Sequence, residues 1–169
     1  MSREIQKLTG DRIGIMLPAS VGAATLCMAT LLANKTPVMI NWTLGPRNLE
    51  HVQSLTKVKV ILTSMKFVDR LGETDLGSLE SLLVFVEDLK NRIGLQDKLR
   101  AVLQARRRAG KLLRDLGLGQ VTGRHEAVIL FTSGSETEPK GVPLTHRNIL
   151  TNLRDAFEVS DYQASDVIL

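Results

Sequence analysis

The chain has 169 residues, of which 43% are hydrophobic and 24% charged, and its formal net charge is +4. This length corresponds to about one domain, and the mean hydropathy of +0.02 is typical of a soluble globular chain. A single cysteine, Cys27, excludes an internal disulfide and is typical of a reducing compartment. The longest apolar stretch, residues 21–33, is shorter than the ~18 residues that a membrane-spanning helix needs.

The first half of the chain alternates short apolar runs with segments of helical spacing. The apolar runs predict buried strands at residues 12–17, 37–40, 58–63 and 82–86. Helices are expected between them, with Ser20 and Asn48 as N-caps of the first two. Strands that alternate with helices indicate crossover connections and parallel pairing. The predicted fold class is therefore α/β, with a mainly parallel sheet flanked by helices.

Residues 91–116 form the most basic segment of the chain. Eight basic and two acidic residues give it a net charge of +6, so the rest of the chain carries −2. Its apolar residues recur at helical spacing, which predicts an amphipathic helix over about 97–116 with Arg106, Arg107 and Arg108 exposed. Three interpretations stay open: a solvated helix whose apolar stripe packs on the core, a helix on anionic lipid, or a helix that meets an acidic partner. Nucleic acid is not an expected partner, because no aromatic platform accompanies the charge.

The most informative segment is residues 131–141, which follow an apolar run at 127–130 that predicts another buried strand. The segment is rich in hydroxyls and glycines and contains a lysine. Glycine lets the backbone approach a ligand, and hydroxyls, backbone N–H groups and lysine all bind phosphate oxygens. We therefore expect a phosphate-binding turn between a parallel strand ending near Phe131 and a helix beginning near Thr145. The segment lacks the Gly-Lys-Ser/Thr of a Walker A loop, which disfavours a P-loop phosphotransferase.

The sequence Thr-Ser-Gly-Ser-Glu-Thr-Glu-Pro-Lys-Gly at residues 132–141 resembles the Thr-Ser-Gly-Ser/Thr-Thr-Gly-x-Pro-Lys-Gly signature of the adenylate-forming, or AMP-binding, enzymes. These include acyl-CoA synthetases, adenylation domains of peptide synthetases and luciferases. Seven of the ten positions match, whereas Glu136 and Thr137 stand where the family usually has Thr and Gly. The Ser-Gly-Ser-Glu version most resembles the acyl-acyl-carrier-protein synthetase half of bacterial 2-acylglycerophosphoethanolamine acyltransferase. The resemblance is strong over residues 127–152, including 144–150 after the loop, and weaker at residues 10–18, 37–41 and 60–64.

This resemblance implies both a fold and a reaction. Residues 1–169 would be a partial AMP-binding domain, the N-terminal portion of the large domain of a longer enzyme, with the rest of that domain and a C-terminal lid outside the chain. In such an enzyme a fatty carboxylate attacks the α-phosphate of Mg-ATP, and the acyl group then passes to a thiol. Lys140 would neutralise the departing pyrophosphate. The phosphates would be held by Thr132, Ser133, Gly134, Ser135, Thr137 and Gly141.

The resemblance also implies cofactors and partners. ATP and Mg²⁺ are the expected cofactors of the full-length enzyme, and no residue of this chain is expected to ligate a metal. The expected partners are a fatty acid and an acyl carrier protein or coenzyme A, in phospholipid acyl recycling, and an anionic membrane that would be met through Arg106, Arg107 and Arg108. The expected location is the cytoplasm, with attachment to the inner face of the bacterial inner membrane as an alternative.

The isolated chain is expected to be inactive, because much of the active site would lie outside it. It is also expected to form a homodimer or to aggregate, because a partial domain leaves sheet edges and apolar surface exposed. One alternative function stays open. It is a non-catalytic module that binds a membrane or a carrier protein through its basic segment and retains the phosphate loop as a relic.

Overall fold

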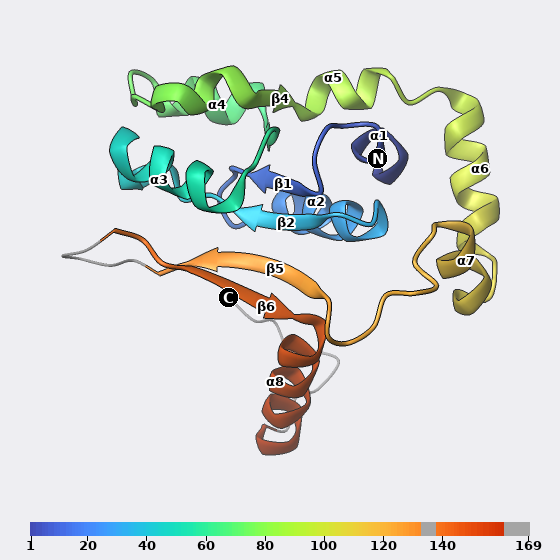
Figure 1. The fold of residues 1–169 in the computed structure, drawn as a ribbon. Coiled ribbons are helices and arrows are strands. Elements are labelled where there is room, and N and C mark those ends of the chain that lie inside the picture. Colours follow the sequence, from blue (N-terminus) through green and yellow to red (C-terminus); the bar gives the residue numbers. More distant parts are fainter. Residues whose placement is uncertain (133–137, 161–169) are drawn as a thin grey trace.

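Six strands pair into one sheet in the computed structural model, which describes residues 1–132 and 138–160 (Figure 1). The strand order is β4-β3-β1-β2-β5-β6, and every pair is parallel except the antiparallel pair of β5 and β6. The predicted α/β class with a mainly parallel sheet is therefore confirmed. The strands are β1 (Arg12–Ile15), β2 (Thr36–Met39), β3 (Ile61–Thr63), β4 (Leu83–Phe85), β5 (Glu126–Phe131) and β6 (Gly141–Thr145).

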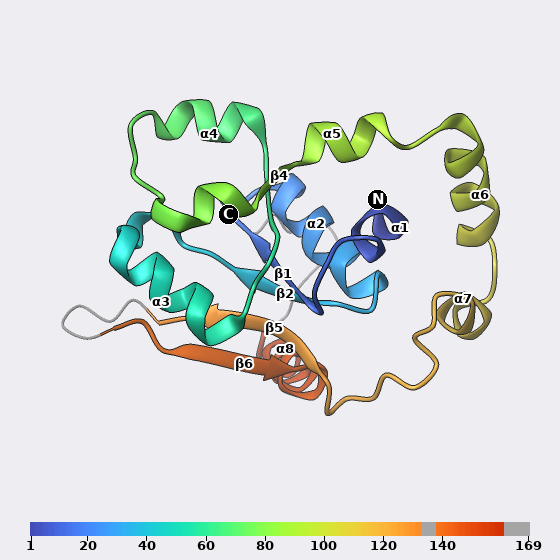
Figure 2. The same ribbon diagram turned by 45° about the horizontal axis from the view of Figure 1, so that its top comes forward.

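Helices cover both faces of the parallel strands, and each face has its own apolar core (Figures 1 and 2). The first core packs against α1 (Ser2–Gln6), α2 (Val21–Leu32) and α5 (Val86–Asn91). The second packs against α3 (Pro46–Thr56), α4 (Met65–Leu71) and the 3-10 helix η2 (Gly77–Leu82). The remaining elements are the 3-10 helix η1 (Trp42–Leu44), α6 (Leu95–Ala105), α7 (Ala109–Asp115) and α8 (His146–Val159).

The central strand β1 shows how the two cores share one sheet. Ile13 and Ile15 are fully buried in the first core, because alternate side chains of a strand point to the same face. Gly14, between them, faces the second core. A Cβ atom at Gly14 would lie 2.7 Å from Cδ1 of Ile40 and 2.9 Å from Cγ1 of Ile61. These two side chains, one just after β2 and one in β3, therefore fill the space that a larger residue would need.

Hydroxyl N-caps begin several of these helices. The Ser20 side chain accepts a hydrogen bond from the Ala23 N–H at 3.2 Å, which confirms the predicted start of α2. The prediction that Asn48 caps the next helix is wrong, because α3 begins two residues earlier at Pro46, with Gly45 as its N-cap. Proline suits the first helical turn, where its missing N–H has no partner to lose.

The basic segment also differs from its prediction. The single helix expected over 97–116 is wrong, because α6 ends at Ala105 and α7 begins at Ala109. The Arg107 guanidinium pairs with the Asp115 carboxylate. In a straight helix these residues would be separated by ~12 Å of rise, so the pair requires the chain to turn between them. The prediction that Arg106, Arg107 and Arg108 are exposed is confirmed.

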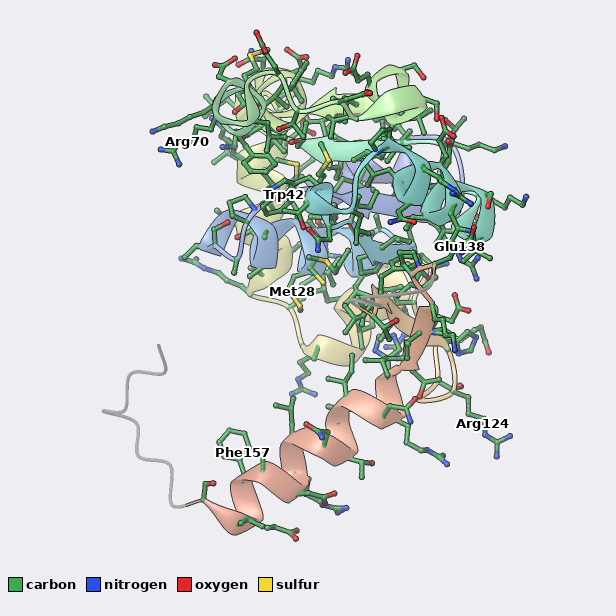
Figure 3. All side chains as sticks on the ribbon, turned by 90° about the vertical axis from the view of Figure 1, so that its left-hand side faces the viewer. Met28, Trp42, Arg70, Arg124, Glu138 and Phe157 are labelled. Carbon is green, nitrogen blue, oxygen red and sulfur yellow. The ribbon has the colours of Figure 1, made fainter. Side chains whose placement is uncertain are left out.

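The last described helix, α8, stands out from the body of the molecule (Figure 3). Between α2, β5 and α8 lies an apolar groove of about 1120 Å³.

At the amino end of the sheet, the Arg12 guanidinium donates to both carboxylate oxygens of Glu126, at 3.0 and 3.1 Å, and so links β1 to β5 across β2. Within the described residues, no helix is both long and apolar enough to cross a membrane.

Candidate functional site

The predicted phosphate loop connects β5 to β6, and its two ends are described by the structure. Phe131 stands opposite Gly141 in the ladder. One residue further on, the Thr132 N–H donates to the Lys140 carbonyl at 3.1 Å, and the Lys140 N–H donates to the Thr132 hydroxyl oxygen at 3.3 Å. These two hydrogen bonds close the base of the loop, so that the ladder holds the two ends of the candidate phosphate site in register.

The hairpin corrects one part of the sequence-based expectation. The strand that ends at Phe131 and the helix capped by Thr145 are both confirmed. The loop does not lead directly into that helix, however, because the antiparallel strand β6 comes first. The presence of Pro143 in this segment argues against an interior strand, and it is compatible with β6 because β6 lies at the edge of the sheet.

The described end residues of the loop offer groups that bind anions. The Thr132 hydroxyl accepts from Lys140, and no described residue accepts its own hydrogen. The Lys140 side chain is exposed and forms no ion pair with a described residue. A hydroxyl donor and an ammonium group are therefore available together at the loop base. Ser133, Gly134, Ser135 and Thr137 lie outside the described residues, and their phosphate contacts stay predictions.

The position of the loop in the sheet suits a ligand site. β1, β2 and β5 run in the same direction, so Thr132, at the described start of the loop, lies at the edge of the sheet where these parallel strands end (Figure 1). Open parallel sheets bind ligands outside the carboxyl ends of their strands. Gly141 has a packing role here, because a Cβ atom at this position would lie 3.3 Å from Cε1 of Phe131.

A contact between a histidine and a carboxylate connects the loop to α3. Oε2 of Glu138 lies 3.3 Å from Nδ1 of His51, and the His51 side chain is only 25% exposed. The charged form of this pair requires a protonated imidazole. The contact directs the Glu138 carboxylate toward α3. The contact between His51 and Glu138 could not be predicted from a local sequence pattern, because the two residues lie 87 positions apart.

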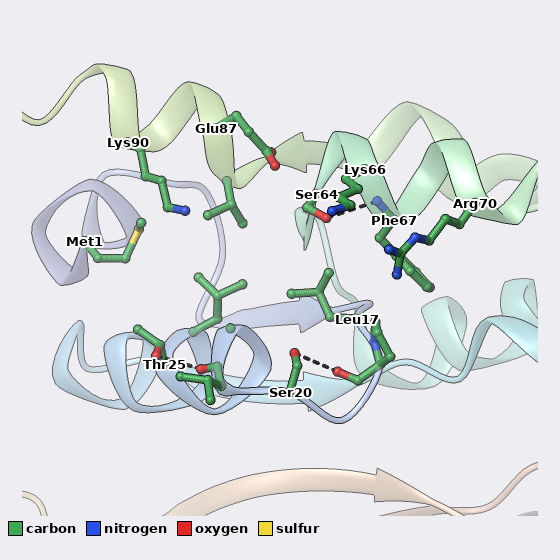
Figure 4. A pocket seen from close by; sticks show the side chains of 15 residues that line it. Met1, Leu17, Ser20, Thr25, Ser64, Lys66, Phe67, Arg70, Glu87 and Lys90 are labelled. Atoms are coloured by element: carbon green, nitrogen blue, oxygen red, sulfur yellow. Dashed lines mark hydrogen bonds between the residues drawn. The ribbon is translucent and has the colours of Figure 1, made fainter.

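A second candidate site, which sequence reasoning missed, is a cavity of about 320 Å³ between α2, α4 and α5 (Figure 4). Its lining includes three cationic side chains, those of Lys66, Arg70 and Lys90, and one carboxylate, that of Glu87. The Glu87 carboxylate accepts a hydrogen bond from the Met65 N–H at 3.3 Å. The lining therefore has an excess of positive charge and suits an anionic ligand.

This cavity also lies beside the carboxyl ends of parallel strands, because its lining residue Ser64 directly follows β3 and Leu17 comes two residues after the end of β1. A signal for it exists in the sequence. Lys66 and Arg70 are four residues apart on a helix that begins immediately after a buried strand, so they share one helix face. Within the described part of the chain, no group of three or more His, Cys, Asp or Glu side chains is arranged to hold a metal ion.

Comparison with known proteins identifies the family. The profile of the AMP-binding enzymes matches residues 3–169. A long-chain-fatty-acid–CoA ligase from Yersinia pestis is 30% identical over 173 aligned positions, which cover 87% of this chain and 29% of the ligase. The chain therefore belongs to the AMP-binding enzyme family.

Solved structures share the fold. O-succinylbenzoate coenzyme A synthetase from Bacillus subtilis, in complex with AMP, matches 98% of this chain with a TM-score of 0.65 at 15% identity. A fatty acyl-adenylate ligase from L. pneumophila matches 96% with a TM-score of 0.62 at 18% identity. The chain spans 39% and 26% of these two proteins. It thus corresponds to well under half the length of each relative described here.

Proposed function

We propose that this chain is the N-terminal portion of an ATP-dependent acyl-activating ligase. One observation carries the proposal: the paired hydrogen bonds between Thr132 and Lys140 hold a hydroxyl donor and a cation at the base of a loop beyond a parallel strand. This arrangement suits the phosphates of a nucleotide. Membership of the AMP-binding family supports ATP as that nucleotide. The residues that complete the active site would lie in the rest of the longer polypeptide.

The proposed roles follow from the chemistry of each group. The Thr132 hydroxyl and the hydroxyls of Ser133, Ser135 and Thr137 would donate to oxygens of the β- and γ-phosphates, while Gly134 and Gly141 would keep the backbone close to the ligand. The Lys140 ammonium would neutralise charge on the departing pyrophosphate, where a preorganised cation is most effective. Mg²⁺ bound with ATP would supply further charge neutralisation, and no described residue is assigned to hold it.

The proposed substrates are a fatty carboxylate and the thiol of an acyl carrier protein or coenzyme A, with a role in phospholipid acyl recycling. The ligase from Yersinia pestis supports a fatty substrate. The cation-lined cavity supports the acceptor, because carrier-bound phosphopantetheine and coenzyme A both carry phosphate on the thiol-bearing arm. Lys66, Arg70 and Lys90 would meet that phosphate.

The test of the loop compares Lys140→Ala with Lys59→Ala in the longer polypeptide. Both substitutions remove one exposed lysine, but Lys59 is remote from the loop in the sequence and lies next to Gly10. Exchange of pyrophosphate into ATP in the presence of a fatty acid should fall about 100-fold in Lys140→Ala, as expected when one transition-state contact is lost. Fatty-acid binding should change little, and Lys59→Ala should behave as the parent. Equal exchange rates in the two variants would rule out the proposed role of Lys140.

The substrate class has a separate test. The same exchange assay is run with fatty acids of several chain lengths, an aryl carboxylate and a set of amino acids. A response to fatty acids alone is expected. Exchange that depends on an aryl carboxylate or an amino acid would keep the acyl-activating function and remove the fatty substrate. The 169-residue chain by itself should catalyse no exchange.

A further inference from the structure

The helix α6 exposes its apolar face instead of burying it. Leu95, Leu99, Val102 and Leu103 are 73%, 58%, 55% and 63% exposed. Their spacing of four, three and one residues places them on one side of the helix. None of the residues of α6 or α7 is buried. The first interpretation of this segment, with the apolar stripe packed on the core, is therefore wrong in this structure.

Positive charge surrounds this apolar face. At about 100° per residue, Lys98 and Arg100 lie on its two flanks, and both side chains are exposed. The exposed residues 106–108, all arginine, follow the end of the helix. The acidic residue of α6, Asp97, lies on the opposite side, where its carboxylate accepts the Gly94 N–H at 3.2 Å. The apolar face is thus bordered by cations and separated from the carboxylate.

We propose that α6 and α7 form a docking surface for an anionic lipid bilayer. The apolar face of α6 enters the boundary between headgroups and acyl chains, and the flanking cations meet the lipid phosphates. An acidic protein surface would satisfy the arginines and lysines but would leave the four apolar side chains against polar groups. Lysine and arginine stems can lie along the helix while their charged ends reach the headgroups. These features favour a bilayer as the partner.

The place of this surface in the molecule agrees with such docking. Figures 1 and 2 both show α6 and α7 at the end of the molecule opposite the carboxyl end of β5. The 11 residues of α6 give it a length of ~16 Å, suited to lying in the membrane plane. A bilayer at this end would leave Thr132 and Lys140, the described ends of the phosphate loop, accessible. The inference goes beyond the proposed acyl activation and does not require it.

The experiment measures partition of the whole chain onto vesicles of phosphatidylcholine with or without about 30% phosphatidylglycerol. Binding is expected to the anionic vesicles alone and to weaken as salt rises from about 0.1 M to about 1 M. The double variant Arg106→Glu/Arg108→Glu should lower the partition coefficient at least about 25-fold, because each of the two cations contributes about a factor of 5 near an anionic surface. The matched control Arg47→Glu/Arg124→Glu makes the same change in net charge at exposed positions on α3 and before β5, and should retain binding.

Insertion of the apolar face has its own readout. Leu99→Ser/Leu103→Ser should lower partition about 10-fold or more, since burial of each leucine is favourable, while Leu55→Ser, at an exposed leucine of α3, should not. A tryptophan in Leu103→Trp should be quenched by bromine-labelled acyl chains, whereas Trp42 of the parent should not.

Three results would each overturn the proposal. They are an equal loss in the two charge variants, the absence of bromine quenching in Leu103→Trp, and binding to an acidic carrier protein with none to anionic vesicles. The quenching measurement uses the folded chain and a single apolar-for-apolar exchange on an exposed face, so it does not depend on whether the multiple variants fold.

Discussion

Gly14→Ala is the sharpest test of the packing between the two cores. Gly14 lies in the central strand, paired with Val38 on one side and Ile61 on the other. The added methyl group would lie 2.7 Å from the Ile40 side chain and 2.9 Å from that of Ile61. Real Cβ atoms essentially never approach this closely, so the neighbouring side chains or the strand must shift. Val58 restricts that shift further, because its Cγ1 would be 3.3 Å away.

The expected cost follows from this geometry. Insertion of one methyl group into a well-packed core costs about 1–3 kcal/mol, and the three contacts at Gly14 favour the upper half of that range. For a chain of this size, each kcal/mol lowers the melting temperature by about 2–4 °C. We therefore expect a loss of about 2–3 kcal/mol in the free energy of unfolding. The matched control is Gly22→Ala in α2, where the nearest atom to the added Cβ is the Ser20 Oγ at 3.6 Å.

Urea unfolding of the two variants and the parent provides the measurement. Trp42 is the single tryptophan of the chain. It packs edge-on against Phe67 with ring centroids 4.7 Å apart, in the same core that Gly14 faces. Its fluorescence and the far-ultraviolet circular dichroism should report the same transition. Gly22→Ala should gain about 0.5–1 kcal/mol, because alanine favours a helix over glycine. A Gly14→Ala variant as stable as the parent would refute the packing argument.

Two further predictions concern α8 and Cys27. Thr145→Ala removes the side chain that accepts the Asn148 N–H at 3.2 Å, so it should cost about 1 kcal/mol and speed amide exchange in the first turn of α8, whereas unchanged exchange would contradict the cap. Burial raises the pKa of the Cys27 thiol, so less thiolate is present near pH 8 and alkylation should be slower than in urea. Because the folded pKa is the higher one, this thiol's contribution to stability is fully present below its unfolded pKa of about 8.5 and is lost as the pH rises through the folded value. Equal alkylation rates in the folded and unfolded chain would show that Cys27 is not shielded.

Several features could be predicted because their signals are local. The apolar runs at β1 to β5 identify buried strands, since a strand covered on both faces needs apolar residues at successive positions. Ser20 and Thr145 identify helix starts, because each cap requires only a side-chain oxygen three residues before an N–H. The phosphate loop is recognised for the same reason, as a contiguous set of hydroxyls, glycines and a lysine.

Other features depend on contacts between distant segments. The β6 segment contains Gly141 and Pro143, and it becomes a strand because β5 pairs with it at the edge of the sheet. The break between α6 and α7 depends on where Arg107 meets Asp115. The need for glycine at position 14 is set by Ile40 and Ile61, which belong to other parts of the chain.

The same division applies to the candidate sites. The sequence by itself determined the residue types of the phosphate loop and the net charge of residues 91–116. Only the tertiary structure decided that the apolar face of α6 lies in solvent, because burial depends on which other elements reach that face. It also decided that Lys66, Arg70 and Lys90 line one cavity, since two helices separated by a strand bring them together. Spacing along the chain specifies faces and caps, whereas a site built from several elements exists only once the sheet has placed them.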